Sequence, residues 1–128
     1  MSTLDTYRNN LLRKREEAAK LNQDLAKEQA KIAPLQQKII SANAAIGRTK
    51  NASTIKSKLN EIERTNKAIA DTQKKVGDIQ KKLAQKEKEI AAAEKTYHSE
   101  ETKVNKKAAD AEKKRIQEAS RQSAALEQ

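Results

Sequence analysis

The chain has 128 residues and a formal net charge of +10, and 21 of its residues are leucine, isoleucine or valine. It contains no cysteine, tryptophan or phenylalanine, and it has only two glycines and one proline. So few large aliphatic residues at this charge are typical of disorder or of a long charged helix. The composition excludes an all-β or α/β domain, which needs β-branched and aromatic residues and frequent turns. It also excludes a disulfide-stapled secreted fold.

The N-terminus shows no targeting pattern. Residues 1–5 lack the basic-then-apolar order of a signal peptide, and no apolar run approaches the roughly 20 residues of a membrane span. A cytoplasmic location is therefore expected. The glycosylation sequon that begins at Asn51 is then a chance match, because glycosylation needs a secretory route.

Apolar side chains recur at every seventh position from the N-terminus to the middle of the chain. This first row is Leu4, Leu11, Ala18, Leu25, Ile32, Ile39 and Ile46. Ser2 and Asp5 form an approximate capping box at its start. The pattern predicts a helix over about 3–46. Pro34 is expected to kink this helix rather than break it, because the seven-residue phase continues across the proline.

The repeat changes phase in the middle of the chain. Ile46 and Ile55 are nine residues apart, which predicts a bend over 47–53. Gly47 suits the left-handed position that ends a helix, and Ser53 suits the N-cap of the next one.

A second apolar row follows the bend. It is Ile55, Ile62, Ile69, Val76, Leu83, Ile90 and Tyr97. With the continuation to Val104, the two rows hold 13 of the 21 large aliphatic residues, where a random seventh of positions would hold about 3. The second row predicts a helix over about 54–118.

A short bend between long helices makes them antiparallel neighbours. The expected fold is therefore all-α, a long antiparallel two-helix coiled-coil hairpin over 1–97 with the two rows as its seam. A neighbouring row of small residues is expected to let the helices approach closely, with Ala19, Ala26 and Ala33 opposite Ala84, Gly77 and Ala70. One long parallel coiled coil with a phase discontinuity near Gly47 is the alternative architecture.

Residues 98–128 have no segment of the first helix to pair with in the predicted hairpin. They are expected to form a helical extension or connector that frays at the C-terminus. The apolar seam is thin for the length of chain that it must order. The hairpin is therefore expected to associate with other copies of itself, as a dimer or a larger bundle.

The sequence offers no catalytic constellation. His98 is the only histidine, so without cysteine no zinc site can be built. Adjacent glutamates such as Glu16 and Glu17 point to different faces of a helix and form no acid/base couple. The two glycines are too far apart for a phosphate loop. We expect no enzyme activity and no catalytic, cofactor-binding or metal-binding residues.

The positive charge is densest at the predicted bend, where residues 47–58 carry four cations and no acid. The candidate anion contacts are Arg48, Lys50, Lys56 and Lys58. A basic helical tip can touch the phosphates of nucleic acid or anionic lipid. Such charge runs are usually solvated, and no stacking aromatic lies there. Anion binding is therefore the alternative function and not the favoured one.

The segment 48–64, RTKNASTIKSKLNEIER, resembles the N-terminal coiled-coil region of certain bacterial TIR-domain (Toll/interleukin-1 receptor-like) proteins, and the resemblance extends over about 4–115. It implies an assembly module that precedes a NAD-cleaving TIR domain in anti-phage defence or effector signalling. No TIR glutamate or α/β segment can be placed on this chain, so NAD cleavage is not carried over. The expected function is a non-catalytic oligomerisation scaffold, either an excised module or a free-standing relative, that positions an attached or partner effector domain.

Overall fold

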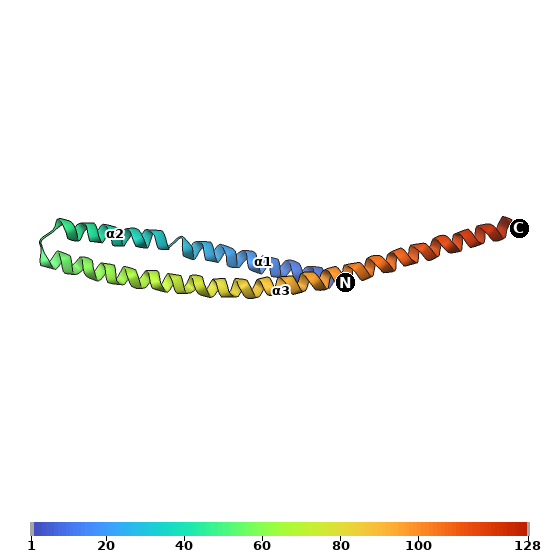
Figure 1. Ribbon diagram of the computed structural model, residues 1–128, viewed down its shortest axis with the longest axis horizontal. Helices are drawn as coiled ribbons and strands as arrows, with labels where there is room; N and C mark the ends of the chain where they lie inside the picture. The colour runs from blue at the N-terminus through green and yellow to red at the C-terminus, as the bar shows by residue number, and fades with distance from the viewer. Residues whose placement is uncertain (1, 128) are drawn as a thin grey trace. The chain divides into compact units, whose positions relative to one another are not determined.

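The computed structural model describes residues 2–127, and nearly all of them are helical. Helix α1 spans Thr3–Gln29, α2 spans Ile32–Arg48 and α3 spans Ala52–Glu127 (Figure 1). Within the described range the chain forms no strand. The predicted all-α class is confirmed.

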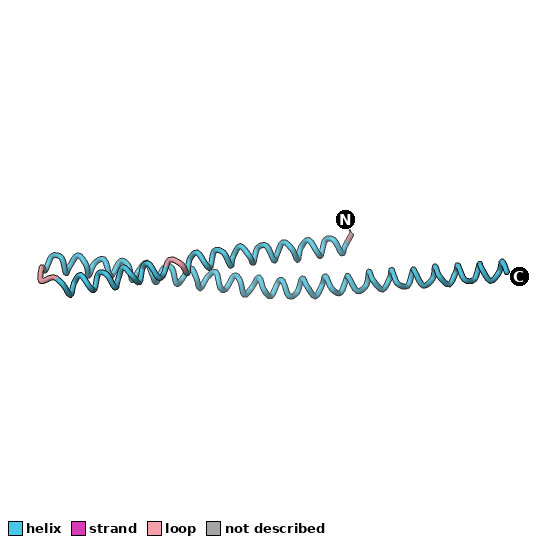
Figure 2. Tube along the Cα trace, turned by 90° about the horizontal axis from the view of Figure 1, so that it is seen from above, coloured by secondary structure: helices cyan, strands magenta, loops and turns pink. Residues whose placement is uncertain are grey.

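The chain divides into two compact units. The loop unit, residues 16–87, contains the end of α1, all of α2 and the first part of α3. In both views α2 and the start of α3 lie side by side and are joined by the short loop at 49–51 (Figures 1 and 2). Lys86 pairs with Glu17, while Leu35 and Thr65 line one surface groove. The loop unit is therefore antiparallel and hairpin-like.

The terminal unit contains the residues up to Arg15 and those from Lys88 onward. Here Lys14 pairs with Glu89, and Tyr7 shares a groove with Thr96. Residue numbers rise on one helix as they fall on the other, so this unit is antiparallel as well. Within each unit, α3 packs against an earlier helical segment of the same chain. The alternative of one long parallel coiled coil, in which the chain does not fold back, does not describe this structure.

The start of α1 is capped as the sequence predicts. The backbone N–H of Asp5 donates a hydrogen bond to Ser2 Oγ at 3.1 Å. The carboxylate of Asp5 pairs with Arg8 at 2.6 Å. The cap is therefore made by the serine hydroxyl, which satisfies one of the amides that a helix leaves without an acceptor.

The single helix predicted over 3–46 is wrong, because the structure interrupts it at residues 30 and 31. The Lys31 N–H bonds to the Glu28 carbonyl at 3.1 Å, and α2 begins one residue later. Pro34 is thus the third residue of a new helix and not a kink within an old one. Proline lacks an N–H and its ring would clash with the Ala30 carbonyl in an unbroken helix, whereas first-turn residues need no helical acceptor.

The predicted caps of the bend are also wrong. Gly47 lies inside α2, and no glycine in residues 2–127 has a positive φ. The helix ends at Arg48, and Thr49 after it is extended. At the other side Asn51 caps α3, since its Oδ1 accepts hydrogen bonds from the N–H groups of Ser53 and Thr54 at 3.0 and 3.2 Å. Asparagine is as good an N-cap as serine, and here it comes two residues earlier.

The third helix is longer than predicted, ending at Glu127 instead of near 118. Every residue from 102 to 126 is exposed. Lysine, glutamate and alanine are good helix formers, so propensity alone favours continuing the helix where packing does not.

Candidate functional site

The predicted seam residues are all at least partly withdrawn from solvent. Leu11 has an exposed fraction of 3% and Leu83 is similarly buried. The remaining members are half-buried: Leu4, Leu25, Ile32, Ile39, Ile46, Ile55, Ile62, Ile69, Val76, Ile90 and Tyr97. The seven-residue rows therefore mark the faces on which α3 packs against α1 and α2.

A second row, three residues after the first, completes each packed face. On α1 and α2 it contains Tyr7, Lys14, Leu21, Glu28, Leu35 and Ala42, of which Ala42 is fully buried. On α3 it contains Lys58, Thr65, Thr72, Ile79, Lys86, Ala93 and Glu100. None of these residues is exposed, although about half are polar. The sequence signal for this row is its spacing of three from the aliphatic row, because residues i and i+3 share a helix face.

Two threonines in this second row are buried. Thr65 Oγ1 donates to the Glu61 carbonyl at 2.8 Å, and Thr72 Oγ1 donates to the Ala68 carbonyl at 2.9 Å. Each hydroxyl therefore has a partner inside its own helix, which removes the main cost of burying it.

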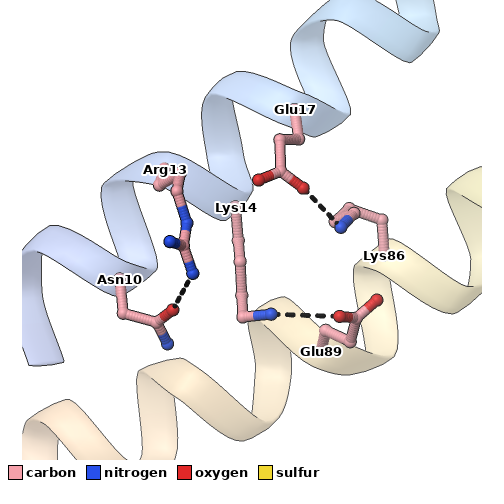
Figure 3. A network of polar contacts seen from close by, with 6 residues as sticks. All are labelled: Asn10, Arg13, Lys14, Glu17, Lys86 and Glu89. Carbon is pink, nitrogen blue, oxygen red and sulfur yellow. Dashed lines mark hydrogen bonds and ion pairs between the residues drawn. The ribbon is translucent and has the colours of Figure 1, made fainter.

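Charged pairs bridge the helices beside the seam. In the terminal unit Lys14 Nζ lies 3.0 Å from Glu89 Oε1, and Arg15 lies 2.9 Å from Glu94. In the loop unit Lys86 Nζ lies 2.6 Å from Glu17 Oε2. Figure 3 shows the Lys14 and Lys86 ammonium groups each directed at the carboxylate of the opposite helix. These bridges join residues that the antiparallel pairing brings together, and each contributes under about 1 kcal/mol where it is exposed.

Glu28 is the one acid in the second row of the loop unit, and its side chain is 17% exposed. Its Oε1 pairs with Lys31 at 2.8 Å, while its Oε2 is buried with no hydrogen-bond partner. The hydrogen bond from Lys31 lowers the pKa of the Glu28 carboxyl below its ordinary value, and the charge of Lys75 acts in the same direction. The residue sits beside the interruption between α1 and α2.

The predicted contact between rows of small residues is wrong. Ala19, Ala26 and Ala33 are exposed, as are Ala70, Ala84 and Ala91 on α3. Gly77 has no atom within 4 Å of an added Cβ, so no neighbour requires a glycine there. These rows begin one residue after the aliphatic rows, which turns them by about 100° around the helix and away from the seam.

The displaced alanines form part of a neutral outer face of the loop unit that runs along α1, the interruption at residue 30 and α2. We call this the outer stripe: Ala19, Gln23, Ala26, Ala30, Ala33, Gln37, Ile40 and Ala44. All its members are exposed, and Ile40 is 59% exposed. None of the outer-stripe residues between Ala19 and Ala44 is charged, although charged residues make up 36% of the chain.

The four cations predicted at the bend differ in exposure and in pairing. Arg48, Lys50 and Lys56 are exposed. Lys58 is half-buried in the second row and pairs with Glu61 at 3.3 Å. The structure therefore brings three cations, and not four, to the surface near the loop.

Tyr97 and His98, two neighbouring residues of α3 in the terminal unit, form no catalytic arrangement. His98 is exposed, and its Nδ1 lies 3.8 Å from the Glu101 carboxylate. Its ring centroid lies 5.5 Å from that of Tyr97. A hydrogen bond with Glu101 raises the pKa of the Tyr97 phenol. Across residues 2–127 no group of three or more histidine, cysteine or acidic residues is placed to hold a metal ion.

Comparisons with protein-family models, with curated proteins and with solved structures find no match for this chain. No helix in the described part of the chain is both long and apolar enough to cross a membrane. The function is therefore argued from the packed faces and the outer faces of the helices.

Proposed function

We propose that this chain is a non-catalytic scaffold, a coiled-coil hairpin whose copies associate into a bundle. The observation that carries the proposal is the outer stripe, a neutral face along α1 and α2 whose members are all exposed in the described part of the chain. A helix with one apolar face packs that face against one partner. A second uncharged face can pack against a further helix, such as one from another copy of the chain. Alanine side chains let a second helix approach closely, and Ile40 adds about 1.5–3 kcal/mol when fully buried.

The resemblance of segment 48–64 to the coiled-coil regions of bacterial TIR-domain proteins supports the same role. We extend the proposal accordingly: the assembled bundle positions an attached or partner effector domain. Anion binding at the bend is the weaker function, because Lys58 is engaged with Glu61.

The test is the mass in solution. Sedimentation equilibrium at tens of micromolar should give a mass above the 14.3 kDa of one chain. The double variant Ala26→Glu with Ala33→Glu places charges on the outer stripe and should reduce the mass to that of the monomer, since a buried unpaired carboxylate is costly.

The matched control is Ala108→Glu with Ala111→Glu, which makes the same change at exposed positions of α3 outside the outer stripe. Its mass should equal that of the unmodified chain, with helical circular dichroism preserved in all three proteins. A monomeric unmodified chain at these concentrations would contradict self-association. Equal dissociation by both variants would contradict the placement of the interface on the outer stripe.

A further inference from the structure

One row of lysines runs along the outward face of α3 at a spacing of seven residues. In the loop unit this lysine row is Lys67, Lys74 and Lys81, each seven residues after the one before. The same spacing continues in the sequence of α3 at Lys88 and Lys95. At 1.5 Å per residue, successive lysines lie about 10.5 Å apart along the helix. Three ammonium groups therefore line about 21 Å of one face.

These lysines are not used by the fold. All three are exposed, and within residues 2–127 none has an ion-pair partner. By contrast, Lys14 and Lys86 beside the seam each bind a carboxylate of the opposite helix. The lysine row is thus free to meet an anion without breaking a contact.

One flank of the lysine row is uncharged and has only short side chains. It consists of Ala70, Gly77 and Ala84, all without charge and with side chains no longer than a methyl group. These short side chains leave the ammonium groups of the row uncovered on this flank. Long lysine side chains extend beyond such a flank, because their stems reach past the neighbouring alanines.

The other flank carries Asp71 and Asp78, which would weaken an anion site if they stood alone. Lys75 and Lys82 follow them at i+4, the spacing and order that favour attraction on a helix. Lys75 and Lys82 match these two acids in number, so the lysine row together with this flank keeps the net charge of +3 that Lys67, Lys74 and Lys81 supply.

We propose that the lysine row of α3 is a peripheral docking surface for an anionic lipid bilayer. Phosphates of a nucleic acid duplex wind around a cylinder, so a straight row meets them only where the strands cross it. A bilayer is flat and presents headgroups to every lysine at once. The chain has no tryptophan or phenylalanine, and the neutral flank has no large apolar side chain to insert. Binding is therefore electrostatic and depends on the lipid charge.

The experiment is co-sedimentation of the full chain with vesicles of phosphatidylcholine, with and without about 30 mol% phosphatidylserine. The chain should bind the anionic vesicles and not the neutral ones, and binding should fall as salt rises from about 0.1 to about 0.5 M. Each lysine near an anionic surface is worth about fivefold in affinity, so Lys67→Gln, Lys74→Gln and Lys81→Gln together should weaken binding on the order of a hundredfold.

The control removes the same charge from another exposed place, by Arg48→Gln, Lys50→Gln and Lys56→Gln at the bend. It should keep binding within about fivefold of the unmodified chain. Equal losses in the two triple variants, or a larger loss in the bend variant, would overturn the proposal, as would no binding to anionic vesicles. Row-dependent binding to duplex DNA without vesicle binding would also overturn it, in favour of nucleic acid. The lysine row and the outer stripe lie on different helices, so the mass of the row variant should not change.

Discussion

At the level of single residues, several polar side chains of the packed faces are accommodated because each has a partner nearby. Thr65 and Thr72 return their hydroxyls to carbonyls of their own helix. Lys14 and Lys86 reach carboxylates across the seam. Glu28 is the exception, because one of its oxygens is buried without a partner.

Thr72→Val is expected to raise the free energy of unfolding by about 0.5–1 kcal/mol. Valine keeps the branched shape, and its methyl group gains from burial where Thr72 is 8% exposed. Thr102→Val is the matched control, since Thr102 makes the same bond to the His98 carbonyl at 2.9 Å but is exposed. Urea denaturation of both variants measures the difference, and an equal effect at the two positions would show that burial is not the cause.

Glu28 is expected to make stability depend on pH on the acid side. Its pKa is lowered in the folded chain, so its contribution is complete above the ordinary glutamate pKa and is lost as the pH falls through the lowered value. Lys31→Met removes the ammonium donor and should raise the Glu28 pKa toward its ordinary value. An NMR titration of the side-chain carboxyls measures this, with Glu112 as reference because Arg115 lowers its pKa independently. An unchanged Glu28 pKa in the variant would contradict the role given to Lys31.

At the level of elements, helix ends are decided by a few residues. Pro34 places a helix start at Ile32, and Asn51 places another at Ala52. The seven-residue row keeps its phase across Pro34 and changes phase at the loop before Ala52, so the repeat marks the second change but not the first. Periodicity therefore locates the faces of these helices better than their ends.

Pro34→Ala is expected to join α1 and α2 into one helix. The gain in unfolding free energy should be roughly 1 kcal/mol, less than the about 3 kcal/mol cost of an interior proline, because Pro34 already sits in a first turn. Amide hydrogen exchange of residues 31–35 should slow relative to the unmodified chain. Exchange as fast as before would mean that the interruption has a cause other than the proline.

Gly77→Ala is expected to stabilise the chain by about 1 kcal/mol, the usual difference in helix propensity, because an added Cβ meets no atom within 4 Å. Gly47→Ala should give a smaller gain, since Gly47 is next to the last residue of α2. Thermal melts of the two variants test this. A loss of stability at position 77 would show that Gly77 packs closely against a second copy of the chain.

At the level of the whole molecule, packing is confined to part of the chain. The residues of α3 from 102 onward have no segment of the chain beside them and are exposed through residue 126 (Figure 1). Most helical stability in proteins comes from packing, so this stretch is expected to be the least stable part of α3.

Deleting residues 105–128 is therefore expected to leave the unfolding free energy within about 1 kcal/mol of that of the full chain, since no buried surface is removed. Urea denaturation at equal concentration measures it. In the full chain, the amides of the deleted region should exchange faster than those of residues 60–90. A clear loss of stability on deletion would show that the extension packs in the oligomer.

The sequence by itself determined the helical class, the two aliphatic rows and the change of phase between them. These follow from local physics: the spacing of apolar residues selects a helix and one face of it. The scarcity of aromatic residues excludes a β-rich domain, and the absence of cysteine excludes a disulfide-stapled fold.

Only the tertiary structure decided which neighbouring row completes that face. Both the alanine row and the row of Thr65 and Thr72 adjoin the aliphatic row, and composition favours the alanines. The threonines lie three residues after the aliphatic row and share its face, while the alanines lie one residue after it and turn away. Packing of α3 against α1 and α2 therefore buries threonine and leaves alanine outside, because the direction of a side chain outweighs its hydrophobicity.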